Sequence, residues 1–206
     1  MYQIQDFKHL LGHTGLSDAL LTNHFALYEG YVNNTNKLAE KLLALRDADQ
    51  AATPEYAELT RRFGWEWNGM RLHELYFGNM MKPESASGEV SSLDKESAEK
   101  QSALSEVLIA QYGSLEAWEK DFRATGAMRG IGWVILSYDK ATSTLVNTWI
   151  NEHDGGHLSG TTPLLVMDVF EHAFMLDYGI KRADYIEAFF ASIDWEVVNK
   201  RYENVA

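Results

Sequence analysis

Two long stretches with apolar side chains at helical spacing open the chain. From Ser17 to about residue 46, apolar residues recur every three or four positions and form one stripe. A second stretch begins at Thr53-Pro54, where threonine suits the N-cap and proline the first helical position, and it runs to about residue 81. The short link between the stretches predicts an antiparallel helical hairpin. Each stripe carries a histidine among its apolar positions, His24 in the first and His73 in the second.

The pattern changes after a polar linker over residues 82–95, whose Pro, Gly, Ser and Glu favour a domain boundary. Beyond it, helical spacing and apolar runs predict further elements: helices over 97–112, 115–126, 170–178, 182–191 and 194–203, and strands over 132–138, 144–150 and 163–167. The sequence therefore predicts an α+β fold. Residues 1–85 form an N-terminal antiparallel helical hairpin domain, and residues 95–206 form a domain of helices around a three-stranded antiparallel sheet.

Composition narrows the possible partners. A formal net charge of −12 over 206 residues argues against a nucleic-acid surface, and an anionic substrate would need local positive steering, for which Lys181 and Arg182 are candidates. The chain has no cysteine, which excludes disulfides and thiolate metal sites and fits a reducing cytoplasm. No apolar run reaches membrane-spanning length, so no membrane partner is expected.

The third predicted strand leads to an acid, Asp168, with His172 four residues later. If a helix begins at Asp168, the carboxylate and the imidazole lie one turn apart and face the same way. One oxygen and one nitrogen suit iron, manganese or zinc. Such a pair arises often by chance, and a single histidine on an apolar stripe is usually a hydrogen-bonded core residue. Taken together, His24, His73 and this pair require a common partner, such as a metal ion.

Five segments of the chain resemble the iron/manganese superoxide dismutase family. Residues 168–173 resemble its Asp-x-Trp-Glu-His-Ala signature, with Phe170 in place of the usual tryptophan. The other four segments match the family's first helix, second-helix ligand segment, Gly-x-Gly-Trp strand and C-terminal segment; they are residues 31–36, 72–80, 130–134 and 193–202. These segments are spread from residue 31 to residue 202, so the resemblance is nearly full-length.

The resemblance implies a redox enzyme that disproportionates superoxide to dioxygen and hydrogen peroxide. One iron or manganese ion per subunit, with solvent as fifth ligand, would cycle between the +3 and +2 states. The ligands implied are His24, His73, Asp168 and His172. The choice between iron and manganese stays open, because both use the same ligands.

The resemblance also implies roles for three further residues. Family members place a Gln or His beside the bound solvent, either four residues before the second-helix ligand or in the loop after the second strand. The first position here is Gly69, so the implied solvent partner is His153, with the phenol of Tyr31 beside it. Glu171 would reach across a homodimer to His172 of the partner subunit.

Two departures from the family pattern leave alternatives open. His24 lies seven residues before Tyr31, where the family usually has eight. If the usual helix carries a π-bulge that this one lacks, His24 still ligates; otherwise it points away from the site. The family's gateway His–Tyr pair is replaced by Leu27 or Tyr28 and by Met175. A non-catalytic structural relative and a zinc hydrolase are the competing interpretations.

Overall fold

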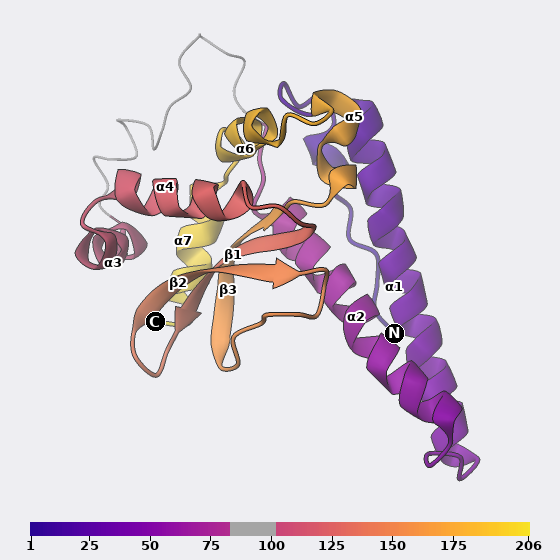
Figure 1. The fold of residues 1–206 in the computed structure, drawn as a ribbon. Helices are drawn as coiled ribbons and strands as arrows, with labels where there is room; N and C mark the ends of the chain where they lie inside the picture. Colours follow the sequence, from indigo (N-terminus) through magenta and orange to yellow (C-terminus); the bar gives the residue numbers. More distant parts are fainter. Residues whose placement is uncertain (83–101) are drawn as a thin grey trace.

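A helical hairpin forms the N-terminal part of the chain in this computed structural model, which describes residues 1–82 and 102–206. Helix α1 (Asp18–Asp47) and helix α2 (Pro54–Gly78) run antiparallel, as Figure 1 shows. The Ser17 hydroxyl accepts a hydrogen bond from the Leu20 N–H, and the Thr53 hydroxyl accepts one from the Tyr56 N–H, so both predicted caps are confirmed. Helix α2 ends three residues before the expected residue 81, and Met80 pairs with Ile193 in an isolated β-bridge.

The second part combines helices with a three-stranded sheet, and the predicted α+β class is confirmed. A short 3-10 turn, η1 (Lys8–Leu10), precedes the hairpin. After the hairpin the described elements are α3 (Ala103–Tyr112), α4 (Leu115–Gly126), β1 (Gly132–Asp139), β2 (Thr144–Asn151), β3 (Thr161–Asp168), η2 (Glu171–Ala173), α5 (Met175–Tyr178), α6 (Arg182–Phe190) and α7 (Trp195–Glu203). Among these described helices, none is both long and apolar enough to cross a membrane.

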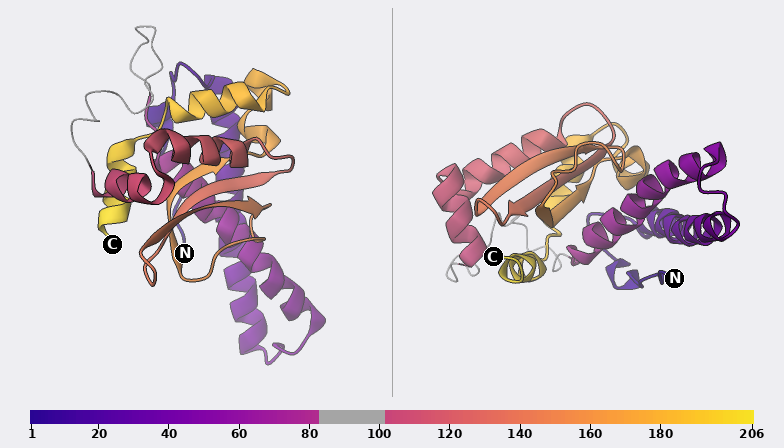
Figure 2. Two further views of the ribbon diagram at one scale, coloured as in Figure 1. Left: turned by 60° about the vertical axis from the view of Figure 1, so that its left-hand side comes forward. Right: turned by 90° about the horizontal axis from the view of Figure 1, so that it is seen from below.

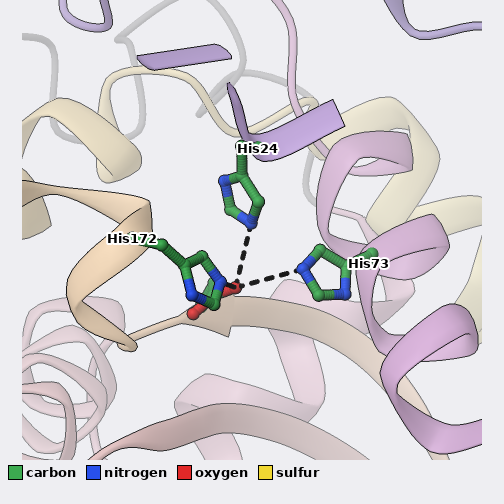
Figure 3. A group of neighbouring side chains, drawn as sticks. His24, His73 and His172 are labelled. Atoms are coloured by element: carbon green, nitrogen blue, oxygen red, sulfur yellow. Dashed lines mark hydrogen bonds and ion pairs between the residues drawn. The ribbon is translucent and has the colours of Figure 1, made fainter. Parts of the chain in front are cut away.

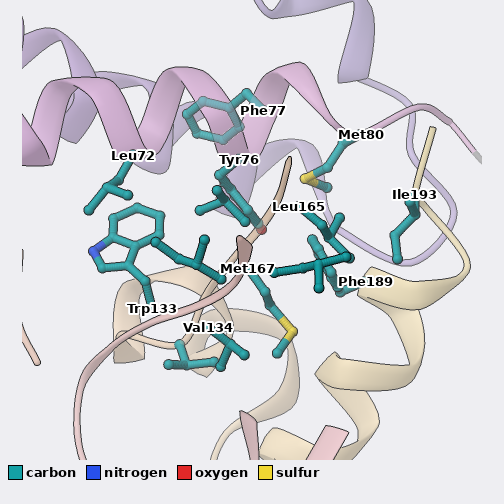
Figure 4. Close-up of a cluster of buried hydrophobic side chains, with 14 of the residues drawn as sticks. Leu72, Tyr76, Phe77, Met80, Trp133, Val134, Leu165, Met167, Phe189 and Ile193 are labelled. Atoms are coloured by element: carbon teal, nitrogen blue, oxygen red, sulfur yellow. The ribbon is translucent and has the colours of Figure 1, made fainter. Parts of the chain in front are cut away.

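The sheet has the order β2-β1-β3, and both pairs are antiparallel. The central strand β1 is almost wholly buried, because α2 packs against one face of the sheet and α4 against the other (Figure 2). The ladder sets Trp133 of β1 directly opposite Asp168 of β3, so these two side chains share a face. That face is the one covered by α2, where Trp133 lies close to Leu72 (Figure 4).

One continuous apolar core joins the hairpin to the sheet. Leu72 and Tyr76 of α2 lie beside Trp133 of β1 within this core, and Phe77 packs next to Tyr76 (Figure 4). The predicted division into domains at 1–85 and 95–206 stays a prediction, because residues 83–101 are outside the part of the chain that the structure describes. The expected start of the third helix at residue 97 lies there too.

The segment around Asp168 differs from the prediction. Asp168 is the last residue of β3, not the first of a helix, and the expected helix over 170–178 is divided into η2 and α5. The backbone of Phe170 is extended (φ −67°, ψ 155°), and its N–H donates to Asp168 Oδ1 at 2.8 Å. This side-chain turn competes with a helical start, as aspartate often does. At Phe174, φ of −145° interrupts the helix again, where its buried ring stacks on Tyr185.

Gly132 makes the start of β1 possible. Its φ is +141°, and a Cβ atom there would lie 1.9 Å from the Ile150 carbonyl oxygen of the neighbouring strand. Only glycine accommodates both the conformation and this close approach. The β1–β2 pairing that this residue permits brings the end of β2, and therefore residues 152–153, back toward α2.

His13 links the N-terminal segment to the loop after α6. Its Nδ1 accepts hydrogen bonds from the N–H groups of Gly15 and Leu16 at 2.9 and 3.0 Å, and its Nε2 lies 2.7 Å from Ser192 Oγ. Since Nδ1 accepts, the ring is the neutral tautomer with its proton on Nε2. Burial, together with the charge of Lys82, lowers the pKa of His13.

We predict that His13 makes the fold sensitive to acid. Its folded pKa is lowered, so its contribution to stability is complete above the unfolded value of 6.5 and is lost as pH falls below it. The variant His13→Asn keeps an acceptor for the two N–H groups but cannot titrate. At pH 8 it should be less stable than the wild type by about 1 kcal/mol. Urea unfolding at pH 8 and 5.5 should show that the difference in free energy of unfolding between wild type and variant is smaller at the lower pH. A difference that stays constant would contradict the role given to His13.

Candidate metal centre

Four potential ligand side chains from four different elements converge on one point (Figure 3). His24 comes from α1, His73 from α2, Asp168 from the end of β3 and His172 from η2. The Nε2 atoms of His24 and His172 each lie 3.2 Å from Asp168 Oδ2, and Nε2 of His73 lies 3.7 Å from the same oxygen. The ligand atoms of all four residues lie within 4.8 Å of one another. His24, His73 and Asp168 are fully buried, and the side chain of His172 is 25% exposed.

The backbone of α2 fixes the tautomer of His73. Its Nδ1 lies 2.6 Å from the Gly69 carbonyl oxygen, one helical turn earlier, and must donate because a carbonyl only accepts. Burial, with the neighbouring His24, lowers the pKa of His73 well below its ordinary value, so the ring is neutral. Its Nε2 lone pair therefore points into the cluster, where no hydrogen-bond donor meets it among the described residues.

Asp168 supplies the negative charge of the site. Burial acts to raise the pKa of its carboxyl, but the charge of His172 and hydrogen bonds from His172 and His24 lower that pKa well below its usual range. One oxygen, Oδ1, is held by the Phe170 N–H, and this leaves Oδ2 directed at the three imidazoles. The turn that ended the predicted helix thus orients the carboxylate.

This arrangement fits a bound cation. An ionised carboxylate oxygen and the unprotonated nitrogen of His73 face each other at 3.7 Å in a buried space, which is unfavourable without a positive charge between them. Three imidazole nitrogens and one carboxylate oxygen suit iron, manganese or zinc. The seven-residue spacing of His24 and Tyr31 does not turn His24 away, because α1 is a regular α-helix from Asp18 to Asp47.

A directed chain of hydrogen bonds lies beside the cluster. The indole N–H of Trp133 donates to Nδ1 of His153 at 3.0 Å, and Nε2 of His153 lies 2.8 Å from the Tyr31 hydroxyl oxygen. Burial lowers the pKa of His153 to about 4, so the ring is neutral with its proton on Nε2. Nε2 therefore donates to the Tyr31 oxygen, and the Tyr31 hydroxyl keeps its own proton to donate elsewhere. Burial, helped by the charge of Asp168, raises the pKa of Tyr31.

Gly69 leaves the space that Tyr31 occupies. The Tyr31 ring stacks on the His73 ring at a centroid distance of 5.2 Å. It also lies so close to α2 that a Cβ atom on Gly69 would be 2.6 Å from Tyr31 Cδ1. A glutamine at position 69 is therefore sterically incompatible with this position of Tyr31, and His153 occupies the neighbourhood instead.

The remaining residues singled out from the sequence lie around this centre. The Phe170 ring stacks between His153 and His172, at centroid distances of 4.9 and 5.1 Å, so an aromatic wall is retained without the family's tryptophan. Glu171 is exposed and lies with His172 at a surface hollow of about 380 Å³, lined by Leu20, Asn23, Glu171, His172, Met175 and Leu176.

Two further positions named from the sequence, Tyr28 and Arg182, make hydrogen bonds within the chain. Tyr28 is buried and its hydroxyl bonds to the Gln5 N–H and to Glu74, so it faces away from the surface, while Leu27 is 41% exposed. The two terminal guanidinium nitrogens of Arg182 donate to carbonyl groups just before β1, those of Met128 and Gly130. Arg182 therefore fixes the backbone there.

Sequence reasoning missed two tryptophans. The sequence marks Trp133 only as part of a strand motif, and no motif includes Trp65. Trp65 packs edge-on against His153 at a centroid distance of 4.5 Å. No local pattern marks either contact, because each depends on the position of the loop after β2.

The fold and the site together define a class: an α+β protein with a buried three-histidine, one-carboxylate site suited to a single metal ion. Comparisons agree with this class. Residues 100–201 match the family model for the C-terminal domain of iron/manganese superoxide dismutases. The chain is 38% identical over 194 residues to the superoxide dismutase [Fe] of Aquifex pyrophilus, covering 92% of this chain and 85% of that protein.

Among further relatives, some are named for iron and some for manganese. The superoxide dismutase [Fe] of Aquifex aeolicus is 36% identical over 210 residues, with 98% of this chain and 92% of that protein covered. Superoxide dismutase [Mn] 2 of Haloferax volcanii is 35% identical over 189 residues, with 91% and 87% covered. The chain belongs to the iron/manganese superoxide dismutase family.

We predict that a methyl group at position 69 disrupts the contact between α2 and Tyr31. Gly69→Ala should lower the free energy of unfolding by about 1–3 kcal/mol, because the Tyr31 ring must move. The matched control is Gly64→Ala on the same helix, where a Cβ atom meets nothing within 4 Å. The control should stabilise the protein by about 0.5–1 kcal/mol. Urea unfolding measures both; equal effects at the two positions would refute the close packing of Tyr31.

Proposed function

We propose that this protein is a superoxide dismutase that converts two superoxide anions and two protons into dioxygen and hydrogen peroxide. The observation that carries the proposal is the convergence of three imidazole Nε2 atoms on Asp168 Oδ2 within a buried site. We propose His24, His73, Asp168 and His172 as ligands of one iron or manganese ion per subunit. When bound, such an ion supplies a one-electron couple that accepts an electron from one superoxide and returns it to the next.

The side chains around the cluster orient its ligand atoms and keep water away. The Gly69 carbonyl holds His73 with its Nε2 lone pair inward, and the Phe170 N–H holds the carboxylate of Asp168. Trp133 packs edge-on against His73 at a centroid distance of 5.0 Å, and Phe170 stacks on His172. Because these neighbours fix the ligand rings, little reorganisation is needed when charge at the site changes.

Tyr31 and His153 form the proton-handling pair of this proposal. His153 Nε2–H donates to the Tyr31 oxygen, which leaves the Tyr31 hydroxyl proton free to be donated toward the site. Peroxide formation requires two protons. Tyr31 is a neutral hydroxyl at physiological pH, because a phenol is ordinarily protonated there and burial raises its pKa further. In this proposal His153 orients Tyr31, and Tyr31 presents the proton.

The competing interpretations are less well supported. A structural relative that does not bind metal has no need for a buried His73 Nε2 that faces an ionised carboxylate and has no hydrogen-bond partner within residues 1–82 and 102–206. A zinc hydrolase requires a general base near the metal. The nearest imidazole outside the cluster, His153, is engaged at both nitrogens by Trp133 and Tyr31.

The test combines metal content with activity. We predict that the purified chain, loaded with iron or with manganese separately, binds about one ion per subunit and disproportionates superoxide with at least one of them. The variant His73→Ala should lose the ion, and its activity should fall at least about 100-fold. His9→Ala, at an exposed histidine, is the matched control and should behave like the wild type. Zinc as the only bound metal, with no dismutation, would favour the hydrolase; no metal at all would favour the structural relative.

We also propose a homodimer in a reducing, cytoplasmic setting, in which Glu171 contacts His172 of the partner subunit. The support is local: Glu171 is exposed beside a surface hollow, and the apolar side chains of Met175 and Leu176 next to it are 47% and 59% exposed. Among the described residues, no hydrogen bond or ion pair of the Glu171 carboxylate is present. The absence of cysteine agrees with a reducing compartment.

The homodimer makes a prediction of its own. Glu171→Ala should weaken self-association by at least about tenfold, since a buried charge-assisted hydrogen bond is worth about 1.5–3 kcal/mol. Glu203→Ala, at an exposed glutamate at the end of α7, should leave association unchanged. Sedimentation velocity over a concentration series measures both. A wild-type chain that remains monomeric at all concentrations would rule out the dimer.

A further inference from the structure

The segment that carries His153 contains a strained residue. Strand β2 ends at Asn151, and Glu152 follows in the left-handed region with φ of 51°. Residues with a side chain avoid this region, and glycine or asparagine is the usual occupant. The turn at Glu152 precedes the fully buried His153, which lies beside Tyr31. Something other than local preference must hold Glu152 in this conformation.

Two backbone hydrogen bonds between Asn151 and Gly155 close this turn, and His157 Nε2 donates to the His153 carbonyl. Trp65 of α2 is the side chain that contacts Glu152 itself. Its indole N–H donates to Glu152 Oε2 at 3.1 Å. Its ring packs edge-on against the His153 ring at a centroid distance of 4.5 Å and lies tilted against the Tyr31 ring at 5.6 Å. Trp65 therefore touches the strained residue and both members of the proton-handling pair.

Trp65 is itself held in place from the other side. The guanidinium of Arg62 lies 3.9 Å from the centroid of the Trp65 ring, a favourable cation–π arrangement. Arg62 also pairs with Glu66 at 2.7 Å, and Glu66 is buried between α1 and α2, where Asn34 donates to it. The indole is thus fixed relative to α2, the same helix that carries His73.

We propose that Trp65 is a positioning residue. Its hydrogen bond to Glu152 holds the left-handed turn, and the turn holds His153 Nε2 at hydrogen-bonding distance from Tyr31. This inference rests on the proposed dismutase function, because it assigns Trp65 and Glu152 to the support of the Tyr31–His153 pair. Neither residue is assigned a contact with the substrate or the metal ion.

The turn offers a test that separates positioning from general stability. In Glu152→Gly, glycine adopts the left-handed conformation without strain, but the acceptor for the Trp65 N–H is lost. We expect the thermal midpoint to stay the same or rise, while kcat for superoxide falls about three- to tenfold because His153 is no longer held. If Glu152 contributed only to stability, its substitution would lower the thermal midpoint and kcat together.

Glu152→Gln is the matched control, because it removes the same charge and keeps a side-chain oxygen that can accept from Trp65. Its kcat should stay within about twofold of the wild type, which excludes an effect of charge on the approach of the anionic substrate. Trp65→Phe keeps an aromatic ring and removes the N–H, so its kcat should fall as in Glu152→Gly. The double variant should be no slower than either single variant, because both remove one interaction.

Crystal structures of the metal-loaded variants give a readout that does not depend on activity. The distance from His153 Nε2 to the Tyr31 oxygen should lengthen in Glu152→Gly and Trp65→Phe and stay near the present 2.8 Å in Glu152→Gln. The inference is overturned if Glu152→Gly and Glu152→Gln have the same kcat, or if the distance is unchanged in both loss variants. A wild-type chain that binds the metal but does not dismutate superoxide would instead refute the proposed function.

Discussion

Electrostatic repulsion inside an apolar core is the constraint on which the structure depends. The ionised carboxylate of Asp168 and the inward lone pair of His73 face each other, and no donor from the described part of the chain meets that lone pair. A buried arrangement of this kind is unfavourable until a cation occupies it. Since the four candidate ligands come from α1, α2, β3 and η2, a cation there joins the hairpin to the sheet. Its binding free energy is then also folding free energy.

The layer around the four candidate ligands is governed by space and by the direction of hydrogen bonds. Tyr31 lies against Gly69 and stacks on His73, so its ring position depends on a missing side chain in α2. The hydrogen bonds run in one direction, from Trp133 to His153 and from His153 to Tyr31, because an indole N–H can only donate. The donor end of this chain lies in the sheet and its acceptor end on α1. The geometry of this layer therefore depends on the distance between the hairpin and the sheet, as the geometry of the metal site does.

The sequence predicts the parts of this arrangement that depend on local periodicity. Both long helices, with caps at Ser17 and Thr53, and all three strands occur near their expected ranges, because apolar spacing and cap chemistry act over a few residues. The predicted proximity of Asp168 and His172 is confirmed, but the helical turn from which it was predicted is wrong. A helical turn and a side-chain turn both bring positions four apart together, and only the structure distinguishes them.

Other features could not be predicted, because they depend on contacts far apart in the sequence. The bond from Trp133 to His153 requires the β1–β2 register and the left-handed turn at Glu152 together. Gly69 could be recognised from the sequence only as the position where a glutamine is missing. Its steric role depends on the ring of Tyr31 on α1, which lies 38 positions earlier in the sequence.

The spacing between His24 and Tyr31 follows from the geometry of a regular helix. Seven residues turn an α-helix through nearly two full turns, so the two side chains differ by only about 20° in direction and by about 10.5 Å along the axis. Both can then reach the same ring: His73 meets His24 edge-on at 5.0 Å and stacks on Tyr31 at 5.2 Å. An added residue without a bulge would rotate Tyr31 by about 100° away from His73. With seven residues between them, the regular geometry of α1 is what places both His24 and Tyr31 against the His73 ring.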